Sequence, residues 1–220
     1  MTKLKNFITE LHQSTKRDFL SRMNDNKIEC MKVAKKFGKE YWDGDRRFGY
    51  GGYKLLPGRW KPLAEKLINQ YNLDNNSKIL DVGCGKAFLL YEIKNILPDI
   101  RILGLDISEH AIKEAPENIT ENLRVFDARK KLPFKDKEFD LVISINTLHN
   151  FKIHDLKTSL SECERVGKKK YLVVEGYRNE DELFNLQCWA LTCESFFSED
   201  EWKWIFHQFG YKGDYEFIYF

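Results

Sequence analysis

From Leu63 onward, the chain alternates amphipathic stretches with short apolar runs that end in polar residues. Short apolar runs predict buried parallel strands, and the amphipathic stretches between them predict helices. Connections of this kind are right-handed, so the series predicts a doubly wound α/β fold with a mostly parallel sheet and helices on both faces. The predicted strands are Lys78–Val82, Ile100–Leu105, Leu123–Phe126, Phe139–Ile145, Tyr171–Glu175 and Tyr215–Phe220. The predicted helices are 62–71, 87–97, 109–115, 154–166 and 199–209, the last opening with a capping box, Ser198 to Glu201.

Polar residues stand at the ends of the predicted strands. In an open parallel sheet, ligands bind beyond the carboxyl ends of the strands, so these residues are candidates for a binding or catalytic site. They are Asp81, Asp106, Asp127, Asn146 and Glu175.

Residues 1–60 differ in character from the predicted domain at 61–220. A helical front is followed by the run Tyr41–Tyr53, which is too rich in aromatic residues and glycine for a solvated linker. We predict an ordered lid over the carboxyl edge of the sheet, with a structural cap over exposed core as the alternative. Residues 1–70 hold 16 Lys or Arg against 8 Asp or Glu, whereas the remainder holds 20 against 26. This basic front suits an anionic substrate, a membrane surface or nucleic acid, although a solvated helix face is the commoner explanation.

Several classes of protein are disfavoured by what the sequence lacks. No apolar run approaches the roughly 20 residues needed to cross a bilayer, and the run Met1–Glu10 does not resemble a signal peptide. The five cysteines are scattered without a Cys-x-x-Cys pair, which predicts reduced thiols, no metal site and a cytoplasmic location. Nothing in the sequence indicates an oligomeric state.

The run Ile79–Ala87 contains a glycine turn. Gly83 and Gly85 follow a predicted strand and precede a predicted helix, so the backbone can bring its amides close to a ligand. Asp106, at the end of the next strand, can accept hydrogen bonds from both hydroxyls of a ribose, which suits any adenosine cofactor. A dinucleotide is disfavoured because Phe88 stands where its fingerprint has a third small residue.

The run Leu80-Asp81-Val82-Gly83-Cys84-Gly85-Lys86-Ala87 resembles the first motif of the class I S-adenosylmethionine-dependent methyltransferases, which have a Rossmann-like fold. The resemblance covers about 150 residues and implies S-adenosyl-L-methionine as cofactor, S-adenosyl-L-homocysteine as product and methyl transfer as the reaction. Two features depart from the family: Ala87 stands where glycine is commonest, and a single closing strand is found where two are usual.

The resemblance also implies roles for individual residues. Asp106 would bind the ribose and Ile107 would pack on the adenine, while Asp127 and Ala128 would meet the adenine amino edge. Asp81 would lie near the methionine amino group. The remaining cofactor residues implied are Gly83, Cys84 and Gly85, through their amides, and Asn146, at a strand end that faces both cofactor and acceptor. For each acid alone, a loop or helix cap is the alternative.

Methyl transfer needs a base for the proton of the acceptor. We predict His149 as this base, because it lies just past the fourth strand and imidazole is the side chain best matched to neutral pH. A histidine that caps the following helix or packs beneath the lid is the alternative. Glu175 is the second candidate, as base or as a group that binds an amine acceptor, with a plain ion pair as its alternative.

The predicted lid supplies further candidates. In small-molecule members of the family, such a segment closes over the cofactor, which implies that Arg59 holds the cofactor carboxylate through its planar guanidinium group. Tyr50, Tyr53 and Trp60 are candidates for contact with the substrate. Gln187 and Trp189 are candidates for the far wall of the acceptor pocket. Surface ion pairing and core packing are the alternatives.

Together these features predict methyl transfer to an oxygen or nitrogen of a small polar metabolite, which the basic front suggests is anionic, such as a phosphorylated or nucleotide-linked sugar. The chain has no Asn/Asp-Pro-Pro-Tyr or Pro-Cys signature, so DNA bases are not expected as acceptors. A protein or RNA methyltransferase and a non-catalytic cofactor-binding module are the alternatives.

Overall fold

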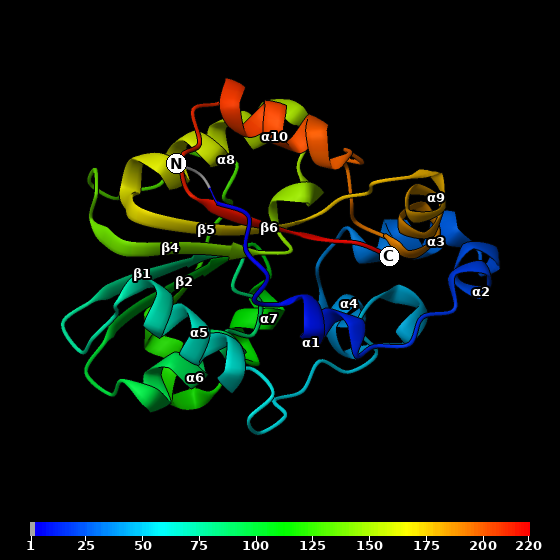
Figure 1. Cartoon of the computed structure of the whole chain (residues 1–220). Helices are drawn as coiled ribbons and strands as arrows, with labels where there is room; N and C mark the ends of the chain where they lie inside the picture. The colour runs from blue at the N-terminus through cyan, green and yellow to red at the C-terminus, as the bar shows by residue number, and fades with distance from the viewer. Residues whose placement is uncertain (1–2) are drawn as a thin grey trace.

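The computed structural model describes residues 3–220, which form a parallel sheet between two layers of helices, with a further group of helices at one end of the sheet (Figure 1). The strands are β1 (Lys78–Val82), β2 (Arg101–Asp106), β3 (Leu123–Val125), β4 (Phe139–Ile145), β5 (Gly167–Glu175) and β6 (Asp214–Ile218). The α-helices are α1 (Thr9–Gln13), α2 (Phe19–Asn24), α3 (Lys27–Ala34), α4 (Lys39–Asp43), α5 (Lys61–Tyr71), α6 (Phe88–Ile96), α7 (Glu109–Lys113), α8 (Ile153–Val166), α9 (Glu180–Trp189) and α10 (Glu199–Gln208). Short 3₁₀ helices are η1 (Arg46–Phe48), η2 (Glu117–Asn122) and η3 (Leu148–Asn150).

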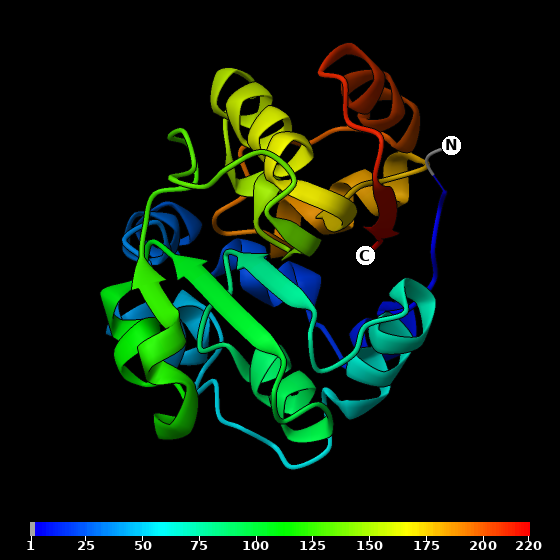
Figure 2. The ribbon, with the colours of Figure 1, turned by 90° about the vertical axis from the view of Figure 1, so that its left-hand side faces the viewer.

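The sheet order is β3-β2-β1-β4-β5-β6, and every neighbouring pair is parallel. Helices α5 and α6 cover one face and α8 and α10 the other, as two views at right angles show (Figures 1 and 2). The predicted fold class is therefore confirmed. Since all strands point the same way, their carboxyl ends meet at one edge, next to α2, α3, α4 and α9 (Figure 1).

The bounds of the predicted elements agree closely with the structure. β1 and β4 have the predicted ends, and the capping box at Ser198 and Glu201 is present. β5 begins at Gly167, four residues earlier than predicted, because Lys168 and Lys169 are exposed and give this strand no apolar signal there. Lysine side chains at a strand end reach solvent while the backbone pairs.

Helix α9 was not predicted. Its start carried a readable signal, since the Asn179 side chain accepts a hydrogen bond from the amide of Glu182, and Glu180, Asp181 and Glu182 fill the first turn. Asparagine at the N-cap and acids in the first turn are typical of a helix start. The aromatic residues that follow were interpreted as a pocket wall or as core packing, and neither interpretation used this signal.

The first described residues pack on the edge strand β6. Lys5 donates to the carbonyl of Tyr215 at 2.8 Å. The buried carboxylate of Glu216 accepts hydrogen bonds from the backbone amides of Phe7 at 2.7 Å and of Thr9, the first residue of α1, at 2.9 Å. The front of the chain is thus joined to the sheet at its edge.

Within residues 3–220, no helix combines the length and apolar character needed to span a bilayer. Nor does this part of the chain contain a cluster of three or more His, Cys, Asp or Glu side chains arranged to hold a metal ion.

Candidate functional site

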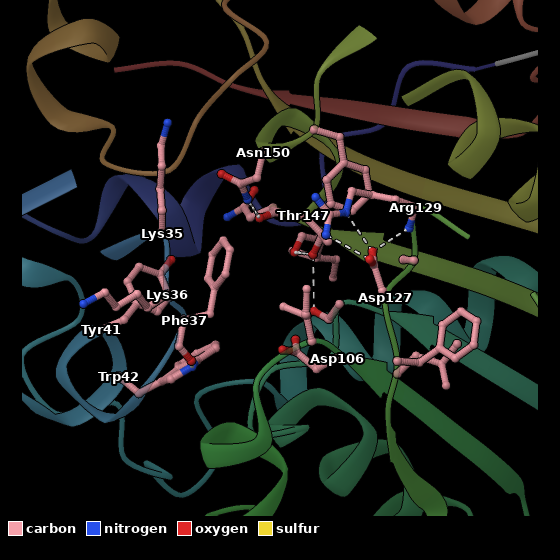
Figure 3. Close-up of a pocket in the computed structure, with 18 of the residues that line it drawn as sticks. Lys35, Lys36, Phe37, Tyr41, Trp42, Asp106, Asp127, Arg129, Thr147 and Asn150 are labelled. Atoms are coloured by element: carbon pink, nitrogen blue, oxygen red, sulfur yellow. Dashed lines mark hydrogen bonds and ion pairs between the residues drawn. The ribbon is translucent and has the colours of Figure 1, made fainter. Parts of the chain in front are cut away.

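Two adjoining cavities lie at the carboxyl edge of the sheet. The first, of about 230 Å³, lies between the ends of β1, β2 and β4 and the segment that joins α3 to α4 (Figure 3). The second, of about 490 Å³, lies between the front of the chain, the end of β5 and the segment after α9. Three residues line both cavities: Tyr41, Tyr50 and Asn146. The cavities therefore meet at the end of β4.

The glycine turn after β1 has the conformation that the motif requires. Gly83 and Gly85 have φ angles of +83° and +55°. A Cβ atom would lie 2.0 Å from Oγ1 of Thr147 at Gly83 and 2.7 Å from the Trp42 ring at Gly85. Both space and backbone angle therefore require glycine. Ala87 also has a positive φ of +56°, which accounts for the prevalence of glycine at this position in the family.

Asp106, at the end of β2, holds the turn and faces the first cavity. Its carboxylate accepts hydrogen bonds from the amides of Gly85 at 2.7 Å and Ser108 at 2.8 Å. Burial raises the pKa of Asp106. Each carboxylate oxygen has capacity for a further hydrogen bond, so Asp106 can still accept one from a ligand hydroxyl with each oxygen.

Asp81 lies buried behind the turn, with a relative exposure of 4%. Its Oδ1 atom has no hydrogen-bond partner among residues 3–220. Burial and the nearby Asp106 raise the pKa of Asp81 to about 8. Because a buried acceptor without a donor is costly, the site is suited to a ligand that brings a positively charged donor. The ammonium group of a methionine moiety has this property, so the acids fit the implied cofactor.

The other wall of the first cavity includes Ile107 and Ala128, as predicted for the adenine side. Asp127 also lines it, but both of its oxygens are held by the guanidinium group of Arg129, at 2.8 and 2.9 Å (Figure 3). This pair lowers the pKa of Asp127. Arg129, two residues after Asp127 in the sequence, was not predicted.

Aromatic residues of the front segment cover the glycine turn. Trp42 stacks on Tyr50 with ring centroids 5.1 Å apart, and Tyr53 stacks on Phe88 at 5.0 Å. The Trp42 indole also donates to the hydroxyl of Ser108 at 2.9 Å. Figure 3 shows Phe37, Tyr41 and Trp42 facing Asp106 across the cavity. The position of this segment at the carboxyl edge of the sheet is the one expected for a lid. Its aromatic packing against the glycine turn is what a structural cap would show, so both alternatives stay open.

Contacts among Asp43, Lys86 and His110 link this segment to the glycine motif. Asp43, the last residue of α4, accepts Nζ of Lys86 at 2.7 Å and lies 2.7 Å from Nε2 of His110 on α7. Lys86 is buried within the glycine turn. None of the three residues was predicted, because they are separated by 24 to 67 positions and only folding brings them together.

The amides of Gly83, Cys84 and Gly85 were expected to face the cofactor, but each donates within the protein, that of Gly85 to Asp106. Cys84 stabilises the turn through its backbone. Its amide and that of Gly83 both donate to the carbonyl of Leu105, at 2.9 and 2.7 Å. Burial raises the pKa of the Cys84 thiol well above its usual value. The thiol points toward Gly104 of β2 and not into either cavity.

The predicted substrate residues line the second cavity. Tyr50, Tyr53, Trp60 and Glu175 are brought together there. Arg59, predicted to bind the cofactor carboxylate, lines this cavity and not the first.

His149 is placed differently from its prediction. It is buried, with 3% relative exposure, and lines neither cavity. Its Nδ1 accepts the backbone amide of Glu175 at 3.1 Å, so the proton is assigned to Nε2, which lies 3.4 Å from the Glu175 carboxylate. Burial lowers the pKa of His149 to about 3. A neutral, enclosed imidazole that lines neither cavity does not reach an acceptor, so the prediction of His149 as general base is revised: its side chain contacts Glu175 instead.

Glu175 ends β5 and reaches the second cavity, where His149 does not. Burial raises the pKa of Glu175 to about 7, with a smaller opposing effect of Arg17. A carboxyl group with this pKa exchanges a proton near neutral pH. Glu175, the second candidate for the base, is therefore better placed than His149 to reach an acceptor in this cavity.

Comparison with known proteins agrees with this geometry. A family model described as a methyltransferase domain matches residues 73–210. Mouse mitochondrial arginine-hydroxylase NDUFAF5 is 30% identical over 109 residues, which are 50% of this chain and 31% of that protein. Demethylmenaquinone methyltransferase of Thermotoga maritima is 26% identical over 144 residues, 66% of this chain and 59% of that protein. The chain thus spans less than two thirds of the length of either relative.

A solved structure shows the same fold. Geranyl diphosphate C-methyltransferase from Streptomyces coelicolor A3(2), crystallised with Mg²⁺, geranyl diphosphate and S-adenosyl-L-homocysteine, superposes with a TM-score of 0.53 at 16% identity. The superposition covers 66% of this chain and 58% of that chain.

Proposed function

The chain belongs to the class I S-adenosylmethionine-dependent methyltransferases, and from this membership we propose that it methylates an oxygen or nitrogen atom of a small polar metabolite. The observation that carries the proposal is the junction of the two cavities at Tyr41, Tyr50 and Asn146. The first cavity adjoins the cofactor motif, and the second provides separate room for an acceptor beside it.

Of the residues proposed to hold the cofactor, Asp106 and Ile107 line the first cavity, whereas Asp81 is buried behind the glycine turn and lines neither cavity. Asp106 would accept the ribose hydroxyls and Ile107 would contact the adenine, while Asp81 would receive the methionine ammonium group. Arg59, in the second cavity, would serve the cofactor carboxylate from the acceptor side. When bound, S-adenosyl-L-methionine supplies a methyl group on a positively charged sulfur.

Asn146 occupies the junction and is proposed to orient the acceptor. It directly follows β4 and has a positive φ of +56°, a conformation that asparagine adopts more readily than most residues with a side chain. Its Oδ1 is buried without a partner among the residues described. An acceptor hydroxyl or amine would supply the missing donor, and positioning of this kind is a main source of rate in group transfer.

Glu175 is proposed as the base that takes the proton of the acceptor. Its carboxyl group lines the second cavity and has a pKa of about 7, so it is largely ionised just above neutral pH. His149 would act as a positioning residue, because both of its ring nitrogens face Glu175.

The covering of the second cavity favours a small acceptor over a protein or RNA surface. Its walls come from α1, α2, the Tyr41–Trp60 segment and the residues after α9. The Asp43–Lys86 ion pair fastens the covering segment to the glycine turn.

Calorimetry with S-adenosyl-L-homocysteine tests the cofactor site. Asp106→Ala and Asp106→Asn should weaken binding at least tenfold, because each hydrogen bond to a charged group contributes about 1.5–3 kcal/mol. Asp99→Ala is the matched control, since Asp99 is an exposed acid just before β2 whereas Asp106 ends that strand. Equal affinity of wild type and Asp106→Ala would refute the assignment.

The acceptor is tested by release of S-adenosyl-L-homocysteine on incubation of the chain with S-adenosyl-L-methionine and a panel of small hydroxyl and amine compounds. The proposal predicts turnover with a small molecule that is lost in Glu175→Gln. Turnover with peptides or RNA and none with small molecules would contradict it.

A further inference from the structure

Three arginines of the second cavity gather on one indole ring. The guanidinium carbons of Arg17, Arg22 and Arg46 lie 5.5, 4.6 and 5.1 Å from the centre of the Trp189 ring. All four residues line the second cavity. They come from the segment before α2, from α2, from η1 and from the end of α9, so folding builds the cluster from four separate places in the chain.

These arginines lack carboxylate partners. Within residues 3–220, no Asp or Glu forms an ion pair with Arg17, Arg22 or Arg46. Arg22 donates instead to the carbonyls of Trp189 at 3.2 Å and Arg46 at 2.7 Å. Arg17 donates from Nη1 to the carbonyl of Thr15 at 3.0 Å and from Nη2 to that of His12 at 3.2 Å, which leaves its buried Nε without a partner in this part of the chain. Other arginines of the protein are paired with acids: Arg47, Arg129, Arg165 and Arg178.

The cluster concentrates positive charge in a partly buried place. Burial lowers the pKa of each of the three arginines, and the charge of Arg46 lowers those of Arg17 and Arg22 further, that of Arg22 to about 10. The nearby carboxylate of Glu175 raises the pKa of Arg17 and so opposes this lowering. A single carboxylate does not balance three guanidinium groups, so an added anion would be bound favourably.

We propose that the second cavity recognises an oxyanion of the acceptor, a phosphate or carboxylate, through Arg17, Arg22 and Arg46, with Trp189 as the floor beneath them. Guanidinium groups bind such oxyanions through paired, charge-assisted hydrogen bonds. This inference rests on the proposed function, because it assigns the acceptor to this cavity. The methyl-accepting atom would then lie at the other end of the acceptor, toward Asn146.

The orientation follows from charge. Asn146 is neutral and Glu175 is the only Asp or Glu among the described residues that line this cavity, so an oxyanion is attracted to the arginines and repelled from the side chain of Glu175. An acceptor with an anionic group at one end and a hydroxyl or amine at the other fits both ends.

Binding of inorganic phosphate, phenyl phosphate and benzoate to the chain saturated with S-adenosyl-L-homocysteine tests this site by calorimetry. Wild type should bind at least one of these probes saturably, and the phosphate and benzoate arms show which oxyanion is preferred. In Arg17→Gln/Arg46→Gln the affinity should fall at least tenfold, since charge-assisted hydrogen bonds are lost. Arg178→Gln is the matched control, because Arg178 also lies over an aromatic ring, Tyr219 at 4.1 Å, but is paired with Glu182 and does not line this cavity.

Affinity for S-adenosyl-L-homocysteine reports folding and should stay within about twofold in these variants. If the double variant does not bind it, Arg46→Gln alone replaces that variant, since Arg46 is exposed. A wild type that binds S-adenosyl-L-homocysteine but none of the three probes, or equal probe affinity in the variant, overturns the oxyanion site. Failure of wild type to bind S-adenosyl-L-homocysteine would instead overturn the proposed function.

Discussion

Glu175 donates its backbone amide to Nδ1 of His149 at 3.1 Å, while its own carboxylate lies 3.4 Å from Nε2 of the same ring. One buried imidazole thereby contacts both the main chain and the side chain of the residue that ends β5. His149 thus contacts Glu175 from within the protein, and Glu175 lines the second cavity.

Replacement of Glu175 by Gln should lower kcat at least about a hundredfold, as expected for loss of a general base. In wild type, kcat should rise with pH through about 7, because the ionised carboxylate is the active form and burial raises the pKa of Glu175 to about 7. This rise should be absent in Glu175→Gln. The pH profile is measured with whichever acceptor supports turnover.

Replacement of His149 by Asn should have a smaller effect on kcat and should move the rise in the pH profile, because His149 acts through Glu175. Affinity for S-adenosyl-L-homocysteine should not change. An His149→Asn variant that loses all activity while Glu175→Gln retains it would reverse the two roles.

Replacement of Asp81 by Asn should stabilise the ligand-free chain at pH 8. The pKa of Asp81 is about 8 in the folded chain, above its unfolded value of about 3.9, so the folded state prefers the protonated acid. The Asp81 contribution to the free energy of unfolding is therefore undiminished below about pH 4 and falls as the pH rises to about 8. We expect Asp81→Asn to be more stable by at least about 1 kcal/mol at pH 8 and to gain little at pH 4.

Thermal unfolding at both pH values measures this effect, with Asp99→Asn as the control. The same Asp81→Asn change should weaken binding of S-adenosyl-L-homocysteine, since it removes the carboxylate proposed for the ammonium group. A variant that is less stable than wild type at pH 8, or that binds the ligand unchanged, would count against the role of Asp81.

Replacement of Gly85 by Ala should weaken the turn and the cofactor site. The new Cβ would lie 2.7 Å from the Trp42 ring, at a residue with φ of +55°. Gly210→Ala is the matched control, because Gly210 has a φ of +72° and no atom within 4 Å of the added Cβ. The control should lose about 1 kcal/mol of unfolding free energy from backbone strain, and Gly85→Ala should lose more. Trp42→Phe in the Gly85→Ala background should restore part of the difference, which chemical denaturation can measure.

Replacement of Asp43 by Asn should loosen the front segment from the glycine turn. It leaves the charge of buried Lys86 without its partner, which costs about 3–5 kcal/mol in typical buried pairs. Asp25→Asn breaks the more exposed pair with Arg47 and should cost less than about 1 kcal/mol. Hydrogen exchange should rise at residues 37–53 in Asp43→Asn alone. Equal exchange in both variants would mean that the contacts of Asp43 do not hold the segment.

Local patterns in the sequence were sufficient for the six strands and for the helices that cover the sheet, although not for α9. The bounds of β1 and β4, the glycine turn at Gly83 and Gly85 and the capping box at Ser198 each depend on residues within a few positions of one another. The order of acids at the ends of successive strands was readable for the same reason, because strand ends follow from hydrophobic periodicity and all parallel strands end at one edge.

The chemistry of the acceptor side depended on the tertiary structure. His149 and Glu175 are 26 residues apart, and Trp189 meets arginines from the first 46 residues of the chain. Whether a histidine faces a cavity or is buried behind a strand, and whether an arginine is paired with an acid or left unpaired, depends on which segments dock together. Burial and charge pairing between such distant residues set their pKa values and their free hydrogen-bonding groups, and no local pattern encodes them. The sequence alone therefore determined the fold and the cofactor motif, whereas docking of the front segment and α9 onto the strand ends decided which side chains face the acceptor.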